Sequence, residues 1–412
     1  MDSEINYFLE LSSCAIHGKD ASPITKVDTN WNQMMSLARI HNMSAILYKT
    51  ISKLKPALQP EERVLHQWKT EAFYQGLHQL GQHQELQVLL EEAKQKGISL
   101  LPFKGLLLAS LYPEPLMRTS SDADILVANE DKDRAIEVLT NRGFHLNEKE
   151  TTETVFVYDK PGTLTVELHT SLWEEYIGDR IHRLENLQLT RPDTLIQVNA
   201  CDIDFITLGY EQHLIYQIYH IIKHFSLSGV GVRHLTDITL YVNTYYDQID
   251  FPGFWKTMEH LNYTTCCYCF FKICVDCLGM KPEAIKDCKC KTNMESKHLI
   301  EDIIDGGVFG NAKDERYHAR NIVKPYLKNE KKVELSKRKM LLRILFPGVE
   351  MITSQYPYAK RHRILVPFAW IQRDFYLIRK HFGKAKDSYG EKTLNQAKCR
   401  LQLLRELDII NK

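Results

Sequence analysis

Apolar residues recur at helical spacing through most of the chain, except between positions 97 and 170. A period near 3.6 residues is typical of helices that bury one face. The segments that this spacing predicts to be helical are 31–54, 64–93, 213–225, 233–246, 254–278, 333–345, 371–382 and 394–410. The N-terminal region, to about residue 95, is therefore expected to be helical throughout.

The middle of the chain has a different pattern, with short apolar runs and turn residues. It predicts strands over 98–103, 122–127, 154–158 and 163–169, and helices over 106–112 and 132–142. Pro161-Gly162 separates the last two strands, as in a hairpin. We expect an α+β fold, in which helical regions flank a small α/β core with a mixed sheet. The predicted domains are a helical region 1–95, the core 96–205, a helical domain 206–310 and a basic, largely helical region 311–412.

Composition indicates an ordinary globular protein, with 44% hydrophobic and 25% charged residues. No apolar run reaches the roughly 20 residues that a membrane-spanning helix needs. The start of the chain lacks the basic and apolar stretches of a secretory signal. Ten cysteines without such a signal indicate reduced thiols and a cytoplasmic location.

The net charge of +1 hides an uneven distribution. Residues 311–412 carry 24 lysines and arginines against 10 aspartates and glutamates, whereas residues 1–310 carry 29 against 42. A basic segment on an acidic body can dock on that body or attract a polyanion such as a nucleotide or an anionic membrane.

Asp122 and Asp124 are separated by one residue on a predicted strand, so their side chains point to the same face. Two carboxylates at this distance repel each other unless a cation lies between them. Magnesium prefers such oxygen ligands. The alternative is a solvated aspartate pair at a strand end.

Two neighbouring motifs strengthen the metal hypothesis. Lys104-Gly105 lies in a strand-to-helix turn, where a bare glycine lets backbone N–H groups approach a phosphate; Lys104 is otherwise an exposed loop lysine. Glu167 and His169 share one face of a later strand. If that strand lies beside the Asp122 strand, three carboxylates converge, as two-metal phosphoryl transfer requires.

The ordered set of these motifs resembles the uncharacterised nucleotidyltransferase family, of the polymerase-beta-like nucleotidyltransferase superfamily. The resemblance covers roughly residues 30–380. The motifs that carry it are Phe103-Lys104-Gly105-Leu106, Leu111-Tyr112-Pro113, Arg118, Asp122 to Val127, Val166-Glu167-Leu168-His169, His220 with His224, Arg233 to Ile238, Leu345-Phe346-Pro347-Gly348 and Tyr356-Pro357. One position departs from the superfamily pattern, since Leu106 stands where a serine is usual.

The resemblance implies a magnesium- or manganese-dependent enzyme with a nucleoside triphosphate donor, expected to be ATP. It would move a nucleoside monophosphate to a hydroxyl or phosphate of an unidentified acceptor, a small molecule or a protein, and release pyrophosphate. Asp122, Asp124 and Glu167 are the expected catalytic metal ligands. The expected triphosphate-binding residues are Lys104, Gly105, Arg118, Ser120 and Ser121.

Two further polar pairs have helical spacing. His220 and His224 share a helix face and could bind metal, contact substrate or pack. Arg233 and Asp237 either form a helix ion pair or border the cleft, where Asp237 would accept the acceptor's proton and Arg233 would hold phosphate. His169 is grouped with them as a cleft residue.

Two segments outside the core admit more than one interpretation. The cysteines at 266–277 have knuckle-like spacing, but their apolar, aromatic surroundings favour a buried helix. Residues 370–380 are basic and amphipathic. They suit a membrane-surface helix, or one that packs its aromatic face on the acidic body and turns Arg373 and Arg379 toward the cleft, which we favour.

Rival functions remain at this stage. The chain could be a catalytically silent nucleotide- or partner-binding module of the same fold, although all three carboxylates are present. A nucleic-acid enzyme would suit the basic tail, but the sequence lacks regular base-stacking aromatics or a helix-turn-helix pattern, so nucleic acid is not an expected partner.

Overall fold

The computed structural model describes most of the chain between residues 3 and 308 and two C-terminal segments. The described residues are 3–20, 29–173, 180–227, 229–290, 292, 296–308, 323, 342, 345–346, 348–349, 352–353, 356–381 and 389–410. The predicted helix 333–345 lies almost wholly outside this set.

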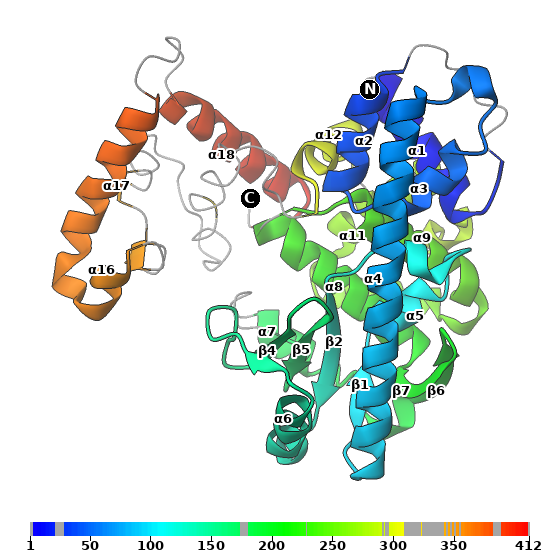
Figure 1. Cartoon of the computed structure of the whole chain (residues 1–412), viewed down its shortest axis with the longest axis horizontal. Coiled ribbons are helices and arrows are strands. Elements are labelled where there is room, and N and C mark those ends of the chain that lie inside the picture. Colours follow the sequence, from blue (N-terminus) through cyan, green and yellow to red (C-terminus); the bar gives the residue numbers. More distant parts are fainter. Residues whose placement is uncertain are drawn as a thin grey trace.

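Four helices form the N-terminal region. They are α1 (Ser3–Ile16), α2 (Trp31–Ile40), α3 (Ser44–Ile51) and α4 (Glu62–Gln95). The predicted segment 31–54 is divided because Asn42 adopts a left-handed backbone (φ 54°), a conformation that asparagine tolerates better than most residues. Helix α4 runs from these helices down to the sheet (Figure 1) and joins the two regions.

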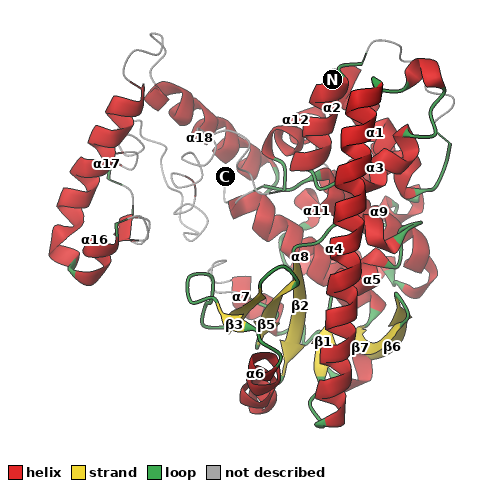
Figure 2. Ribbon diagram, viewed as in Figure 1, coloured by secondary structure: helices red, strands yellow, loops and turns green. Residues whose placement is uncertain are grey.

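The core contains a five-stranded mixed sheet in the order β1-β2-β5-β4-β3 (Figure 2). Only β2 and β5 are parallel neighbours; the other pairs are antiparallel. The strands are β1 (Leu100–Pro102), β2 (Asp122–Val127), β3 (His145–Leu146), β4 (Val155–Lys160) and β5 (Leu164–His169). The helices are α5 (Gly105–Ala109), α6 (Lys132–Asn141) and α7 (Arg180–Glu185). The α+β fold class is therefore confirmed.

A separate hairpin of β6 (Leu195–Ala200) and β7 (Ile203–Leu208) was not predicted. Its two-residue turn, Cys201-Asp202, has positive φ at both positions without glycine or proline. The usual hairpin signal is thus missing from the sequence.

The second helical region comprises α8 (Tyr210–Leu227), α9 (Val232–Tyr245), α10 (Phe251–His260), α11 (Thr264–Leu278) and α12 (Ser296–Gly306). The predicted helix 254–278 is two helices, which separate where Asn262 has a φ of 57°. In α11 the thiols of Cys266, Cys267 and Cys274 are fully buried among hydrophobic side chains, as predicted for a core helix. Burial raises the pKa of Cys274 to about 12, so this thiol stays protonated.

The C-terminal helices are α16 (Pro357–Arg361), α17 (Val366–His381) and α18 (Tyr389–Glu406). Leu401 and Leu404 of α18 belong to the main core, whereas α16 and α17 stand away from the body (Figure 1). The favoured packing of 370–380 is wrong, because Phe375 is 68% exposed and Arg373 is buried, bonded to Asp374 at 2.8 Å. Among the described helices, none is long and apolar enough to cross a bilayer.

Candidate active site

The carboxylates lie on adjacent parallel strands. Asp124 on β2 is in register with Glu167 on β5, so the two Cα atoms are direct neighbours across the sheet. Ala123 and Ile125 are buried on the opposite side, as strand alternation requires. The condition stated for the sequence, that the two strands lie side by side, is therefore met.

His169 completes a compact set of metal-ligating atoms. One atom each from Asp124, Glu167 and His169 lies within 4.8 Å of the others. The His169 Nε2 atom is 3.3 Å from Asp124 Oδ1 and 3.5 Å from Glu167 Oε2, and both ring nitrogens are buried without a well-directed hydrogen-bond partner among the described residues. Burial lowers the pKa of His169, yet the two carboxylates outweigh burial and leave that pKa above its ordinary value.

Asp122 and Asp124 experience opposite electrostatic environments. Burial, then repulsion by Asp124 and Glu167, raises the pKa of Asp122. Burial alone would also raise the pKa of Asp124, but Lys104 and His169 hold it below its usual range. The Lys104 Nζ atom is 2.8 Å from Asp124 Oδ1. The lysine therefore stabilises the ionised form of Asp124, whereas burial and the neighbouring carboxylates disfavour the ionised form of Asp122.

The turn that carries Lys104 is held in a strained conformation. Lys104 has a φ of 67°, which is costly for a residue with a side chain. Its backbone N–H donates to His213 Nε2 at 2.9 Å, and the Gln217 amide lies 3.1 Å from His213 Nδ1. Sequence reasoning missed His213 and Gln217, because nothing in the spacing of α8 distinguishes them from core residues.

Gly105 opens helix α5 beside this turn. A Cβ atom placed there would meet no protein atom within 4 Å, although the residue lines the cavity. The glycine is thus not required by packing, and its bare backbone faces open space.

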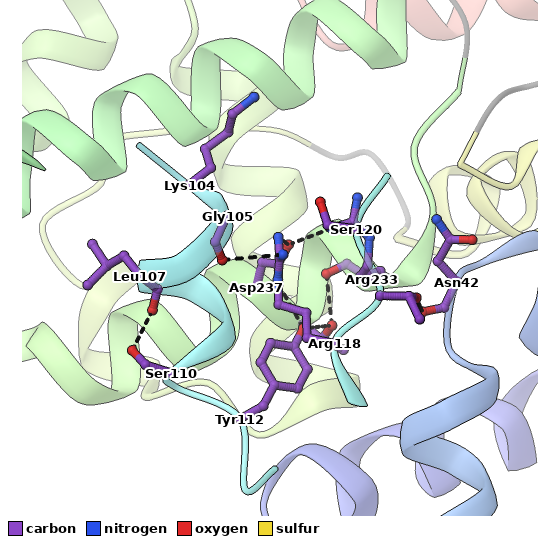
Figure 3. Close-up of polar contacts among 12 residues, drawn as sticks. Asn42, Lys104, Gly105, Leu107, Ser110, Tyr112, Arg118, Ser120, Arg233 and Asp237 are labelled. Carbon is purple, nitrogen blue, oxygen red and sulfur yellow. Dashed lines mark hydrogen bonds and ion pairs between the residues drawn. The ribbon is translucent and has the colours of Figure 1, made fainter. Parts of the chain in front are cut away.

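Arg118 forms a bidentate ion pair with Asp237 (Figure 3). Its Nε and Nη2 atoms donate to the two Asp237 oxygens at 2.8 and 2.9 Å, and the Tyr112 hydroxyl donates to Oδ1 at 2.8 Å. Burial raises the pKa of Asp237, but Arg118 and Arg233 outweigh burial and leave that pKa below its ordinary value. This carboxylate is therefore ionised, and its acceptor sites are occupied.

Arg233 is less completely satisfied than Arg118. Its Nη1 atom lies 3.5 Å from Asp237 Oδ2, and its buried Nε atom has no hydrogen-bond partner in the described part of the chain. The residue lines the same cavity as the carboxylates. A buried donor without a partner is costly, so this guanidinium is suited to an anion that enters the cavity.

Ser120 and Ser121 face the Asp122 carboxylate. The Ser120 hydroxyl lies 3.3 Å, and the Ser121 hydroxyl 3.5 Å, from Asp122 Oδ1. The predicted phosphate-binding serines thus orient a carboxylate in this structure.

Histidines from α8 and α9 also line the cavity. His220 Nε2 and His224 Nε2 are 2.9 Å apart, and the ring of His234 lies 6.1 Å from that of His224. Burial is the main cause that holds the pKa of all three well below the ordinary value. These three imidazoles are therefore neutral and offer hydrogen-bond donors and acceptors to the cavity.

These groups enclose one cavity of about 560 Å³, within the size range of small-molecule sites. Of the thirteen residues that the sequence singled out, all line it: Lys104, Gly105, Arg118, Ser120, Ser121, Asp122, Asp124, Glu167, His169, His220, His224, Arg233 and Asp237.

A family model described as uncharacterised nucleotidyltransferase matches residues 28–279. The chain belongs to this family. The resemblance inferred from the motifs is confirmed, and family membership supports a transferase that moves a nucleotidyl group. No curated protein matches the chain in sequence.

Solved structures show only a remote likeness. The crystal structure of ANT(2")-Ia in complex with adenylyl-2"-tobramycin is 10% identical, with 42% of this chain and 91% of that chain covered and a TM-score of 0.31. A nucleotidyltransferase-like protein from Paracoccidioides brasiliensis is 16% identical, with 38% and 73% covered and a TM-score of 0.27.

Proposed function

We propose that this member of the nucleotidyltransferase family transfers a nucleoside monophosphate from a nucleoside triphosphate, with ATP the expected donor, to a hydroxyl or phosphate of an acceptor, with release of pyrophosphate. The observation that carries the proposal is the alignment of Asp124 with Glu167 on parallel strands, with Asp122 on the same wall of the cavity. The acceptor is a small molecule or a protein.

The donor set suits magnesium or manganese, because it is rich in carboxylate oxygens. Burial, and then the charges of Asp124 and Glu167, raise the pKa of Asp122, so a cation bound there would stabilise its ionised form. Asp122, Asp124 and Glu167 would hold the metal, with His169 beside them. When bound, the metal would offset the triphosphate charge and acidify the attacking hydroxyl.

The remaining residues bind and orient. We propose that Lys104 leaves Asp124 for a phosphate oxygen when the cluster is neutralised, and that Gly105 admits the phosphate to the backbone of the turn. Arg233 is the second phosphate-binding cation. Asp237 holds Arg118 in place through both carboxylate oxygens, so we assign these two a positioning role.

The direct test uses nucleotides labelled at the α-phosphate. Pure protein, magnesium and a cell extract should move the label from one nucleoside triphosphate to an acceptor, while label at the γ-phosphate should appear in pyrophosphate. Binding of nucleotide without any transfer, across all four nucleotides and several extracts, would favour a catalytically silent module instead.

Gly105→Val should weaken nucleotide binding by about 10-fold or more, because the branched side chain blocks the approach of phosphate to the backbone. Stability should change little, within about 0.5 kcal/mol, since the new side chain meets open space. Titration calorimetry and thermal unfolding would measure both. Gly81→Val on α4 is the matched control, because its Cβ also meets nothing within 4 Å but lies outside the cavity. Unchanged affinity in folded Gly105→Val protein would place the phosphate elsewhere.

His213→Ala should lower turnover by about 10- to 100-fold, the usual effect of removing a residue that orients a catalytic group. It should also cost about 1–3 kcal/mol of stability, because the Lys104 N–H loses its buried acceptor. Turnover and unfolding free energy are the measurements, and His213→Gln should restore part of both.

Thr207→Val is the control for His213→Ala. It removes a buried bond of 2.7 Å to the Pro102 carbonyl in the neighbouring strand, without touching the cavity. It should lower stability and leave turnover per folded molecule unchanged. If His213→Ala behaves like Thr207→Val, then His213 is only structural.

A further inference from the structure

Helix α17 has two unlike faces. Val366 and Ala369 pack against Ile352 and Ala359 in a small second core, separate from the main one. The opposite face is exposed and apolar. Its residues, with their exposed fractions, are Phe368 (71%), Ile371 (66%) and Phe375 (68%), and Ile364 (88%) precedes them in the 3-10 turn Arg363–Leu365.

These four side chains form one continuous stripe. Within α17 the spacing of three and four residues places Phe368, Ile371 and Phe375 on a single line, and Ile364 lies four residues before Phe368. Within α17, from Phe368 to Phe375, the stripe is about 10 Å long at 1.5 Å per residue. Tyr376, 60% exposed, lies at its edge. A contiguous exposed stripe of this kind marks an interaction surface, unlike scattered apolar residues.

Exposed cations flank the stripe in the sequence. Lys360, Arg361 and Arg363 precede it, and Arg379 follows it. All four are exposed, and the C-terminal hundred residues have a large excess of lysine and arginine. A partner that is apolar where it meets the stripe and anionic beside it would complement these residues.

We propose that the stripe on α17 is a docking surface for an anionic lipid bilayer. The helix would lie in the plane of the interface, with Phe368 and Phe375 inserted and the cations on lipid headgroups. Apolar insertion and a polybasic cluster are the two signals that stable peripheral binding requires. The finding that none of the described helices can cross a bilayer is compatible with such surface contact.

Charge argues against pairing of two copies through this face. Packing α17 of one copy on α17 of another would bring the arginines of both together around an apolar seam, where like charges repel. The proposal does not depend on nucleotidyl transfer, because the stripe lies outside the catalytic cavity.

Flotation of the full-length protein with vesicles tests the proposal. Binding to vesicles of four parts phosphatidylcholine and one part phosphatidylserine should exceed binding to pure phosphatidylcholine by about 10-fold or more, and should fall as salt is raised. Phe368→Ser with Phe375→Ser should lower binding about 10-fold or more. Arg361→Gln with Arg363→Gln should lower it roughly 25-fold, about fivefold per cation.

Phe73→Ser with Leu77→Ser is the matched control, since these residues are 61% and 49% exposed on α4. It should leave vesicle binding unchanged, and circular dichroism should show that every variant is folded. Equal binding to neutral and anionic vesicles, or no binding at all, would overturn the proposal. A dimer in light scattering that the Phe368/Phe375 substitutions dissociate, without vesicle binding, would overturn it in favour of a second copy.

Discussion

Asp124→Asn should lower nucleotidyl transfer by at least roughly 10³-fold, because a bound metal contributes several kcal/mol to the transition state. The same variant should unfold at a lower temperature, since Lys104 remains buried without the carboxylate at 2.8 Å. Turnover by label transfer and metal-free thermal unfolding are the two measurements.

Asp122→Asn should lose as much activity but unfold at a higher temperature. The pKa of Asp122 is raised by burial and by Asp124 and Glu167, so a neutral side chain relieves repulsion. Opposite thermal shifts with equal loss of turnover would distinguish a shared metal site from simple damage to the fold. Near-wild-type turnover in either variant would contradict the proposed site.

Two further substitutions sharpen this test. Glu167→Gln should lower turnover steeply while nucleotide affinity stays nearly unchanged, as expected for an interaction made in the transition state. Asp159→Asn is the control, because this β4 carboxylate lies outside the cavity. Its Oδ1 atom accepts a hydrogen bond from the Thr165 hydroxyl at 2.7 Å. It should keep full turnover per folded molecule.

The protein should unfold when the pH falls from 7 to about 5, because it buries a group of neutral histidines. Burial lowers the pKa of His41 to about 4 and, with nearby cations, that of His213 to about 3. His220, His224 and His234 are lowered as well. In the unfolded chain each of these histidines gains a proton as the pH falls through about 6.5, whereas in the folded chain it stays neutral.

Proton binding explains why the protein loses stability as the pH falls. Below about pH 6.5 the unfolded state holds more protons, so each histidine removes about 1.4 kcal/mol of stability for every unit by which the pH falls. This loss continues until the pH reaches the folded-state pKa, which is about 4 for His41 and about 3 for His213. Several together would exhaust a stability of roughly 5–15 kcal/mol within about two units. His169 acts oppositely: its raised pKa adds stability below about 6.5 that is lost as the pH rises through the folded value.

Unfolding temperatures measured from pH 5 to 8 would test this expectation. His41→Asn keeps an acceptor for the Val232 N–H and should reduce the steepness by about one proton. The exposed His182→Asn should leave the profile unchanged. A midpoint that is the same at pH 5.5 and 7.5 would contradict the account.

Part of the site was predictable because strand geometry is local. Alternation along a strand places Asp122 and Asp124 on one face whatever the rest of the chain does, and it places Glu167 with His169 in the same way. The parallel pairing that joins these two pairs could only be stated as a condition, since strand pairing depends on residues about 40 positions apart.

Other parts required tertiary structure. Arg118 and Asp237 are 119 residues apart, and His213 contacts a backbone N–H 109 residues away, so spacing within one helix could not reveal either partner. The same reason explains why the packing predicted for residues 370–380 of α17 was wrong. A basic amphipathic pattern specifies two faces of a helix but not what covers each face. Local periodicity thus determined the secondary structure and which side chains share a face, whereas contacts between distant segments decided which charges are paired and which remain for a ligand.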